Sequence, residues 1–231
     1  MRELEELEWY RYFVHNKSIH GSLFTLIHLP FMMAFLSLVV IGIIPLQAAD
    51  NTVLVLSLVV VFLLLYGEHF IDDMFRVGKP WGTVFSDRTL ISIAMILFLI
   101  AGAIGIYADA LLDSALPYLA VLTGVVFCVL YGLEIWKFHT VGFGALGMSA
   151  IPMASYTAQV IAAGGSVNLV TAALLGIFGF TYGYVMLALY EETKTFKYKI
   201  MWKLLGVHFM MIYGLAGILI FLRSIMSITH T

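Results

Sequence analysis

The stretch that decides the fold is Leu65–Leu90, LYGEHFIDDMFRVGKPWGTVFSDRTL, which closes a long apolar run. In a chain that is only 11% charged, this short segment gathers many ionisable side chains: Glu68, His69, Asp72, Asp73, Arg76, Lys79, Asp87 and Arg88. On a helix, Glu68 and Asp72 lie one turn apart, as do His69 and Asp73. We therefore expect these groups to share one face at the end of a membrane span, where they can hold a cation, an anion or both.

The composition argues against a soluble domain. The chain has 231 residues, of which 62% are hydrophobic, and its mean hydropathy is +1.01. Soluble domains carry about 25% charged residues, so the composition predicts an all-α, polytopic membrane protein. The single cysteine, Cys128, lies in an apolar run and offers no disulfide framework. The acidic N-terminus lacks a cleavage-site pattern, so we do not expect a secretory signal peptide.

Seven apolar stretches are long enough to cross ~30 Å of hydrocarbon, some of them with tilt. We expect an amphipathic interfacial helix over residues 1–20, a seven-helix membrane domain over 21–223 and a short outer tail over 224–231. The seven spans are predicted near 21–44, 53–71, 89–107, 115–133, 140–162, 168–190 and 203–223.

The distribution of positive charge predicts the orientation. With seven spans, all of the 12 lysine and arginine residues except Arg223 fall on the side of the N-terminus. Cytoplasmic loops are enriched in lysine and arginine, so this side is predicted to be cytoplasmic and the C-terminus to lie outside. We expect a multi-pass protein of the plasma membrane whose polar site faces the cytoplasm.

Other ionisable groups are predicted at the same level of the bilayer. Glu134 and His139 follow the fourth span, and Glu191 and Glu192 end the sixth. The fifth and sixth spans are rich in glycine and other small residues, which indicates close helix packing and leaves open room for a lipid chain between the helices. Aromatic residues on these spans would form either core or the wall of such a slot: Phe143, Tyr156, Phe178, Phe180, Tyr182 and Tyr184.

One chemistry that suits this residue set is binding of a prenyl diphosphate. Carboxylate oxygens bind Mg²⁺, which bridges phosphate oxygens, and arginine and lysine neutralise the remaining charge. Cleavage of an allylic diphosphate depends above all on stabilisation of the leaving group. An apolar slot would hold the prenyl tail and keep water away from the allylic cation.

The segment YGEHFIDDMFRVGKPWGTVFSDRTLIS resembles the first aspartate-rich motif and following loop of the UbiA-type intramembrane prenyltransferases. His69 takes the place of that family's Asn, with Asp73 as the paired Asp. Lys79-Pro80 stands where Arg-Pro is expected, and Ser86-Asp87-Arg88 precedes the third span. Glu191 and Glu192 close the sixth span, as the family's second acidic motif does. The resemblance, over about residues 20–203, implies a membrane helix bundle that transfers a prenyl group.

Under this hypothesis each charged residue has an expected role. Mg²⁺ is held by Glu68, Asp72, Asp73, Glu134, Glu191 and Glu192. The diphosphate contacts Arg76, Lys79, Arg88 and Lys137. The catalytic residues are His69, Asp73 and His139. The expected partners are a prenyl diphosphate, a lipid or quinone-like acceptor and membrane lipids; no nucleic acid is expected, and the oligomeric state stays open.

Two alternatives remain. Carboxylates and imidazoles from several helices are also the ligands of di-iron proteins, so the same set would suit a membrane oxidoreductase with iron as its metal. The candidate iron ligands are Glu68, Asp72 or Asp73, Glu134, Glu191, His69 and His139. The third possibility is a non-catalytic membrane protein for binding or transport, because ionisable residues inside membranes mark ligand and ion pathways.

Overall fold

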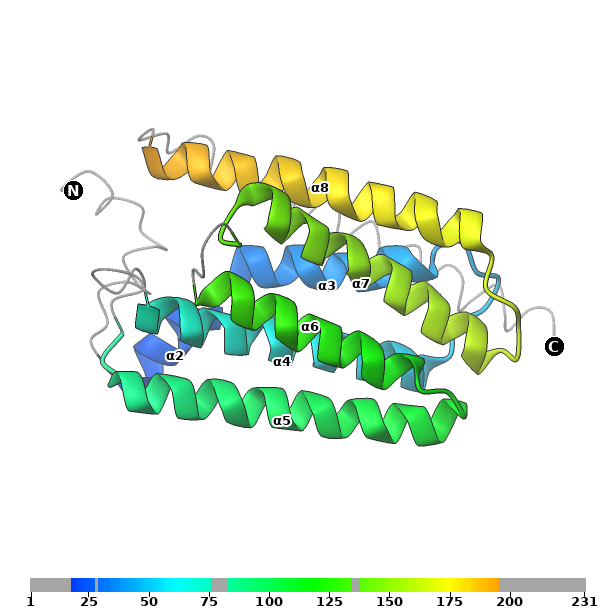
Figure 1. Ribbon diagram of the computed structural model, residues 1–231, viewed down its shortest axis with the longest axis horizontal. Coiled ribbons are helices and arrows are strands. Elements are labelled where there is room, and N and C mark those ends of the chain that lie inside the picture. Colours follow the sequence, from blue (N-terminus) through cyan, green and yellow to red (C-terminus); the bar gives the residue numbers. More distant parts are fainter. Residues whose placement is uncertain (1–17, 28, 76–82, 134–137, 196–231) are drawn as a thin grey trace.

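The computed structural model describes residues 18–27, 29–75, 83–133 and 138–195 of the chain. These ranges contain helices and no strand, which confirms the predicted all-α fold. In chain order the helices are α2 (Ile19–Ile27), α3 (Leu29–Ile43), α4 (Asn51–Phe75), α5 (Asp87–Leu112), α6 (Leu116–Gly132), α7 (Val141–Ala162) and α8 (Leu169–Thr195). The longer helices lie side by side along one axis and form an elongated bundle (Figure 1).

The helix boundaries differ from the predicted spans in four places, one of which is the end of α5, at Leu112 instead of the predicted 107. The first span, expected as one helix over 21–44, consists of two helices, α2 and α3. Pro30 lies at the start of α3 and has no N–H to continue the hydrogen bonding of α2, which explains the break. Helices α4 and α8 run past their predicted ends. Asp72 and Asp73 are therefore part of α4, and Glu191 and Glu192 are part of α8. The predicted span 203–223, the tail and nearly all of the predicted interfacial helix lie outside the described residues.

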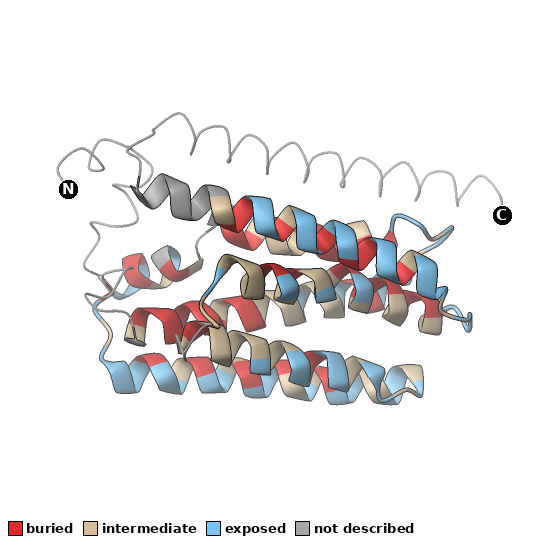
Figure 2. Ribbon diagram, turned by 45° about the horizontal axis from the view of Figure 1, so that its top comes forward, coloured by how far each residue is buried: buried red, intermediate tan, exposed pale blue. Residues whose placement is uncertain are grey.

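Three helices are long and apolar enough to cross a membrane. They are Asn51–Met74, Asp87–Leu112 and Leu169–Ala188. Two shorter apolar helices, Phe31–Ile43 and Leu116–Gly132, accompany them. Many large apolar side chains on α5 and α8 are exposed, and alternating exposed and buried positions are visible along both helices (Figure 2). These surfaces are compatible with a membrane protein.

Two packing groups make up the bundle. Helices α4, α5 and α6 pack together, with α2 against α4, around a core that includes Leu26, Phe70 and Phe98. Helix α3 packs with α7 and α8 around Leu38 and Met148. The groups meet where α3 and α7 contact α4, and where α6 contacts α7.

Small residues allow the helices of the second group to approach closely, as predicted. A Cβ atom added at Gly183 would lie 2.8 Å from the sulfur of Met148, and one at Gly179 would lie 3.0 Å from the Met148 carbonyl oxygen. A Cβ at Gly42 would come within 2.5 Å of the Pro152 carbonyl oxygen. These contacts are shorter than van der Waals separation, so the glycines permit the packing of α8 and α3 on α7.

Polar side chains lock the ends of several helices. Asp50 and Gln159 form a two-bond clamp in which the Asp50 N–H donates to the Gln159 side-chain oxygen (2.7 Å) and the amide nitrogen donates to the Asp50 carbonyl (3.0 Å). The hydroxyl of Ser155 donates to the Val39 carbonyl at 2.7 Å. Ser86 and Thr140 cap the first turns of α5 and α7. The bonds of Gln159 and Ser155 hold α7 against the start of α4 and against α3.

Candidate functional site

The acidic cluster of α4 lies inside the protein. Glu68, His69 and Asp72 are 6%, 5% and 5% exposed, and Asp73 is fully buried. Burial of ionisable groups is costly unless other groups compensate, so their position at the end of an apolar helix is not that of an ordinary helix end in water. The cluster is therefore an internal polar group and not a solvated helix end.

A cavity of about 140 Å³, which we call the chamber, opens beside this cluster. Its polar end is formed by Glu68, His69 and Asp72 of α4 and by His139, which precedes α7. The remaining wall is apolar and aromatic and comes from five helices; it includes Phe31 and Phe35 of α3, Phe127 and Tyr131 of α6, Phe143 of α7 and Leu187 of α8. A pocket that is mostly apolar with a few polar groups at one end suits an amphiphilic small molecule.

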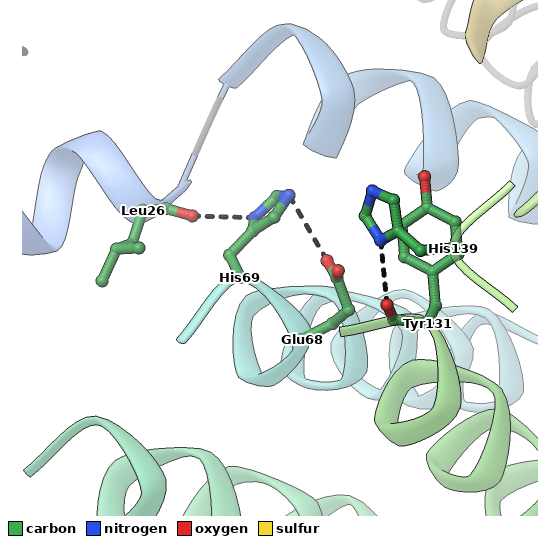
Figure 3. Close-up of polar contacts among 5 residues, drawn as sticks. All are labelled: Leu26, Glu68, His69, Tyr131 and His139. Atoms are coloured by element: carbon green, nitrogen blue, oxygen red, sulfur yellow. Dashed lines mark hydrogen bonds and ion pairs between the residues drawn. The ribbon is translucent and has the colours of Figure 1, made fainter. Parts of the chain in front are cut away.

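His69 is held in place by the break between α2 and α3. Its Nδ1 donates a hydrogen bond to the Leu26 carbonyl oxygen at 2.9 Å (Figure 3). In a continuous helix this carbonyl would accept from the N–H of residue 30, which is a proline and has none. The imidazole therefore supplies the hydrogen-bond donor that Pro30 cannot give to the Leu26 carbonyl. Its Nε2 then faces the Glu68 carboxylate, 3.6 Å away.

His139 approaches the same end of the chamber from the other side. Its Nδ1 donates to the Tyr131 carbonyl oxygen at 2.9 Å, and its ring lies 4.3 Å from the Tyr131 ring, measured between centroids. Tyr131 is in the last turn of α6, where carbonyls lack intrahelical partners. In Figure 3 the Glu68 carboxylate points into the space that both imidazoles border. Two of the three predicted catalytic residues, His69 and His139, thus line one chamber with Glu68.

Asp73, the third predicted catalytic residue and a predicted metal ligand, does not line the chamber. Its carboxylate accepts a hydrogen bond from the Thr83 hydroxyl in the segment before α5. The next residue, Val84, donates its N–H to the Ser22 hydroxyl of α2 at 3.1 Å. Asp73 therefore connects α4 to the segment that enters α5, and it is not part of the chamber wall.

The other predicted site residues are distributed as follows. Arg88 is exposed in the first turn of α5 and is not part of the chamber wall. Glu191 and Glu192 belong to α8, and Glu191 occupies the helix position one turn after the chamber residue Leu187; the side chains of both lie outside the described part. Arg76, Lys79, Glu134 and Lys137 lie outside the described residues.

The described side chains do not by themselves form a metal centre. Among them there is no group of three or more His, Cys, Asp or Glu side chains placed to hold a metal ion. Although Glu68, His69, Asp72 and Asp73 are close in sequence, Asp73 is not part of the chamber wall, and its carboxylate bonds to Thr83. A metal site would therefore need carboxylates from outside the described side chains.

Several chamber residues were not among the predicted site residues. Phe127, Cys128 and Tyr131 of α6 form a large part of the wall, and Gly124 continues it along the helix. The sequence signal for them is the i, i+3, i+4, i+7 spacing of these four positions, which places them on one face of α6. Because α6 is apolar on every side, that spacing does not distinguish the chamber face from a lipid face.

The fold and the chamber define an all-helical protein with membrane-length apolar helices and an internal, acid-ended apolar cavity. Comparisons of the chain with protein-family models, with curated proteins and with solved structures find no match.

Proposed function

We propose that the chain is a multi-pass membrane enzyme of the prenyltransferase type, which moves a prenyl group from a diphosphate donor to a lipid or quinone-like acceptor. The observation that carries this proposal is one chamber with a long apolar wall and a buried carboxylate–imidazole group at its end. A prenyl diphosphate has the same two parts, a hydrocarbon chain and a polar head.

The aromatic wall supports the proposed chemistry. When the bond between the prenyl carbon and the diphosphate oxygen breaks, positive charge develops on the allylic carbon. The faces of aromatic rings attract cations, and a dry wall prevents capture of the cation by water. The rings of Phe31, Phe127, Tyr131 and Phe143 border the chamber, so a reacting carbon held near Glu68 would have such rings around it.

The proton balance of the transfer assigns a role to Glu68 and His69. The electron pair of the breaking carbon–oxygen bond leaves with the diphosphate, and the acceptor atom forms the new bond to carbon. The acceptor must then lose a proton. Because Nδ1 of His69 is engaged with Leu26, its Nε2 and the Glu68 carboxylate 3.6 Å away form the pair that takes this proton. His139 orients the acceptor from the opposite wall.

Magnesium is the metal that this chemistry implies, and iron is the metal of the oxidoreductase alternative. The described residues alone do not fit either ion, because they form no group of three or more metal-binding side chains. The carboxylates that would complete a site are Glu134, Glu191 and Glu192. The proposed diphosphate contacts are Arg76, Lys79 and Lys137. No step of the proposed reaction is assigned to a metal.

The proposed placement in the membrane follows from the charge distribution. Three membrane-length helices support a membrane protein. Lysine and arginine gather in the segments next to the polar end of the chamber, and the positive-inside rule makes that end cytoplasmic. We therefore propose a seven-span protein of the plasma membrane with a cytoplasm-facing site and an outer C-terminus.

A binding protein for the same kind of amphiphile is the second candidate. It is favoured by one observation, namely that the described residues of the chamber hold no metal-binding group. In that case the chamber would hold a lipid without transforming it.

Turnover of a labelled prenyl diphosphate tests the proposal. Purified protein in native-like lipid is incubated with labelled geranylgeranyl diphosphate, Mg²⁺ and a membrane lipid extract, and the release of diphosphate and the transfer of label are measured. Replacement of Glu68 by Gln is expected to reduce transfer by about 10²–10⁴-fold, the usual loss on removal of a general base. Asp113→Asn is the matched control, because Asp113 is exposed at the end of α5 in the left-handed region that Asn tolerates.

The outcomes separate the candidates. Transfer by the wild type and by Asp113→Asn, together with its loss in Glu68→Gln, supports the enzyme. Binding of the labelled compound without diphosphate release supports the binding protein. Tightly bound iron in the purified protein, with no diphosphate release, supports the oxidoreductase alternative and overturns the prenyltransferase proposal.

A further inference from the structure

The polar end of the chamber carries acidic side chains and no described basic chain of lysine or arginine. Its ionisable residues are Glu68, His69, Asp72 and His139, and the described chamber wall contains no lysine or arginine. Glu68 and Asp72 are 6% and 5% exposed. A carboxylate inside a protein is stabilised by an opposite charge or by hydrogen-bond donors that face it. This end of the chamber therefore favours a ligand with positive charge over a neutral or anionic ligand of the same size.

The two histidines of the chamber are held in the same tautomer. Nδ1 of His69 lies 2.9 Å from the Leu26 carbonyl oxygen, and Nδ1 of His139 lies 2.9 Å from the Tyr131 carbonyl oxygen. A carbonyl oxygen only accepts hydrogen bonds, so Nδ1 carries the proton in both rings. In a neutral imidazole the other nitrogen, Nε2, then has a lone pair and is an acceptor. Both rings therefore offer an acceptor beside the Glu68 carboxylate (Figure 3).

Two of these acceptors are close enough for one ligand atom to contact both. Nε2 of His69 lies 3.6 Å from a carboxylate oxygen of Glu68. A nitrogen that donates to each of them at about 2.8 Å can sit between them, because charge-assisted hydrogen bonds have about this length. A ligand nitrogen with several N–H groups therefore suits this end better than a group with a single donor.

The aromatic part of the chamber wall also attracts cations. The rings of Phe127 and Phe143 stack with their centroids 4.8 Å apart, and the Tyr131 ring lies 4.3 Å from the His139 ring. These side chains border the chamber, and the faces of aromatic rings attract positive charge. The wall and the polar end therefore favour the same sign of charge in a ligand.

The size of the chamber restricts the ligand to a compact molecule. Its volume is about 140 Å³. An apolar protein cavity of about 150 Å³ holds one benzene molecule. A ligand whose apolar body has the size of one aromatic ring therefore fills the space.

We propose that the chamber is a binding site for a primary ammonium group on a compact apolar body, such as a protonated arylalkylamine. The ammonium N–H groups donate to the Glu68 carboxylate and to Nε2 of His69 and of His139, and the apolar body lies against the aromatic wall. A quaternary ammonium has the same charge but no N–H to donate, and a phosphate has the opposite charge. This site goes beyond the proposed function and does not depend on prenyl transfer.

Binding of four benzyl compounds to the full chain tests this site. Benzylammonium, benzyltrimethylammonium, benzyl alcohol and benzyl phosphate share one apolar body and differ in charge and in hydrogen-bond donors. Their affinities are measured by calorimetry in native-like lipid, with the signal of protein-free lipid subtracted. At pH 8 an alkylamine is protonated and free imidazole is neutral. Because hydrogen bonds to charged groups are the stronger ones, benzylammonium is expected to bind at least about tenfold more tightly than each of the other three.

Two pairs of variants assign the contacts. Glu68→Gln removes the carboxylate and is expected to abolish the preference for benzylammonium over benzyl alcohol. Asp113→Asn, the same kind of change at an exposed position, is expected to keep that preference. His139→Phe keeps a ring beside Tyr131 but lacks Nε2, so it should weaken benzylammonium binding several-fold and leave benzyltrimethylammonium binding unchanged. His20→Phe, at an exposed position of α2, is its control.

The comparison of the four compounds in the wild type tests the proposal even if a variant does not fold. Equal affinities for benzylammonium and benzyl alcohol, tightest binding of benzyl phosphate, or no binding of any compound would overturn the ammonium site. Benzyltrimethylammonium that binds as tightly as benzylammonium would overturn the role of the two histidines as acceptors. Because no turnover is measured, these results are separate from the test of prenyl transfer.

Discussion

His69 and Leu26 are joined by a 2.9 Å hydrogen bond from Nδ1 to the carbonyl oxygen, and this bond connects the end of α2 to the polar end of the chamber. A second α4 side chain acts one turn earlier in the same way, since the Tyr66 hydroxyl donates to the Leu23 carbonyl at 3.0 Å. The final turn of α2 is thus capped by side chains from α4. Nδ1 of His69 is engaged in this hydrogen bond, so Nε2 is the ring nitrogen that a molecule in the chamber can contact.

The first prediction concerns this bond. His69→Ala leaves the Leu26 carbonyl without the imidazole, and we expect the free energy of unfolding to fall by about 1–3 kcal/mol. Pro30→Ala supplies the N–H that α2 lacks, so His69→Ala should cost about 1 kcal/mol less in that background. Thermal unfolding of the four proteins of this double-mutant cycle, followed by helical circular dichroism, measures the difference. An equal cost of His69→Ala in both backgrounds would show that proline is not the reason for the bond.

The second prediction concerns Asp73, which the sequence placed in the catalytic and metal-binding set. Thr83→Val keeps the shape of the side chain and removes the donor to the buried Asp73 carboxylate. Because hydrogen bonds to charged groups are worth about 1.5–3 kcal/mol, we expect a loss of stability of that size. Thr181→Val is the control, since Thr181 is exposed on α8 and its hydroxyl donates to the Ile177 carbonyl one turn earlier in the same helix. Unfolding in detergent measures the stability of both variants. A loss in Thr83→Val as small as that in Thr181→Val would contradict a structural role for the hydrogen bond between Thr83 and Asp73.

The third prediction compares two helical glycines. Gly42→Ala would place a methyl group 2.5 Å from the Pro152 carbonyl oxygen, so α3 and α7 must separate and the protein should lose stability. At Gly102 of α5 a Cβ atom meets nothing within 4 Å. Gly102→Ala should therefore stabilise by about 0.5–1 kcal/mol, the usual gain of alanine over glycine within a helix. Melting temperatures that shift in the same direction for both variants would contradict the packing of α3 on α7.

The sequence predicted the helical class and most of the helix positions because apolar runs and glycine-rich turns mark them directly. It also identified Glu68, His69, Asp72 and His139, since ionisable residues stand out against an apolar background. The helix period placed Asp73 one turn from His69, and that spacing was read as a shared site. A helix has neighbours on every side, however, and the Asp73 carboxylate bonds to Thr83, ten residues further along the chain.

The walls of the chamber were harder to predict than its polar end. Phe127 and Tyr131 are two of several aromatic residues on apolar helices, and hydrophobicity alone does not separate a residue that faces lipid from one that faces a cavity. Among the aromatic residues proposed for a slot, Phe143 lines the chamber, Tyr156 is buried in a core, and Phe178, Phe180 and Tyr184 are exposed. The difference depends on which helices pack against α7 and α8, which is a tertiary property.

The last prediction concerns the clamp between Gln159 and Asp50, which holds α7 against the start of α4. Its amide both accepts from the Asp50 N–H and donates to the Asp50 carbonyl, and it is only 3% exposed. Gln159→Leu keeps the bulk and removes both hydrogen bonds between the buried amide and the Asp50 backbone, so we expect a loss of about 1–3 kcal/mol. Gln159→Glu keeps an acceptor but loses the donor, so it should also destabilise. Gln47→Leu, at an exposed position near the same end, should change stability by less than about 0.5 kcal/mol. Thermal unfolding of the three variants measures these losses of stability. If Gln159→Leu and Gln47→Leu unfold at the same temperature, the clamp contributes nothing measurable to stability. The spacing of α4 and α7 must then be set by their apolar contacts alone.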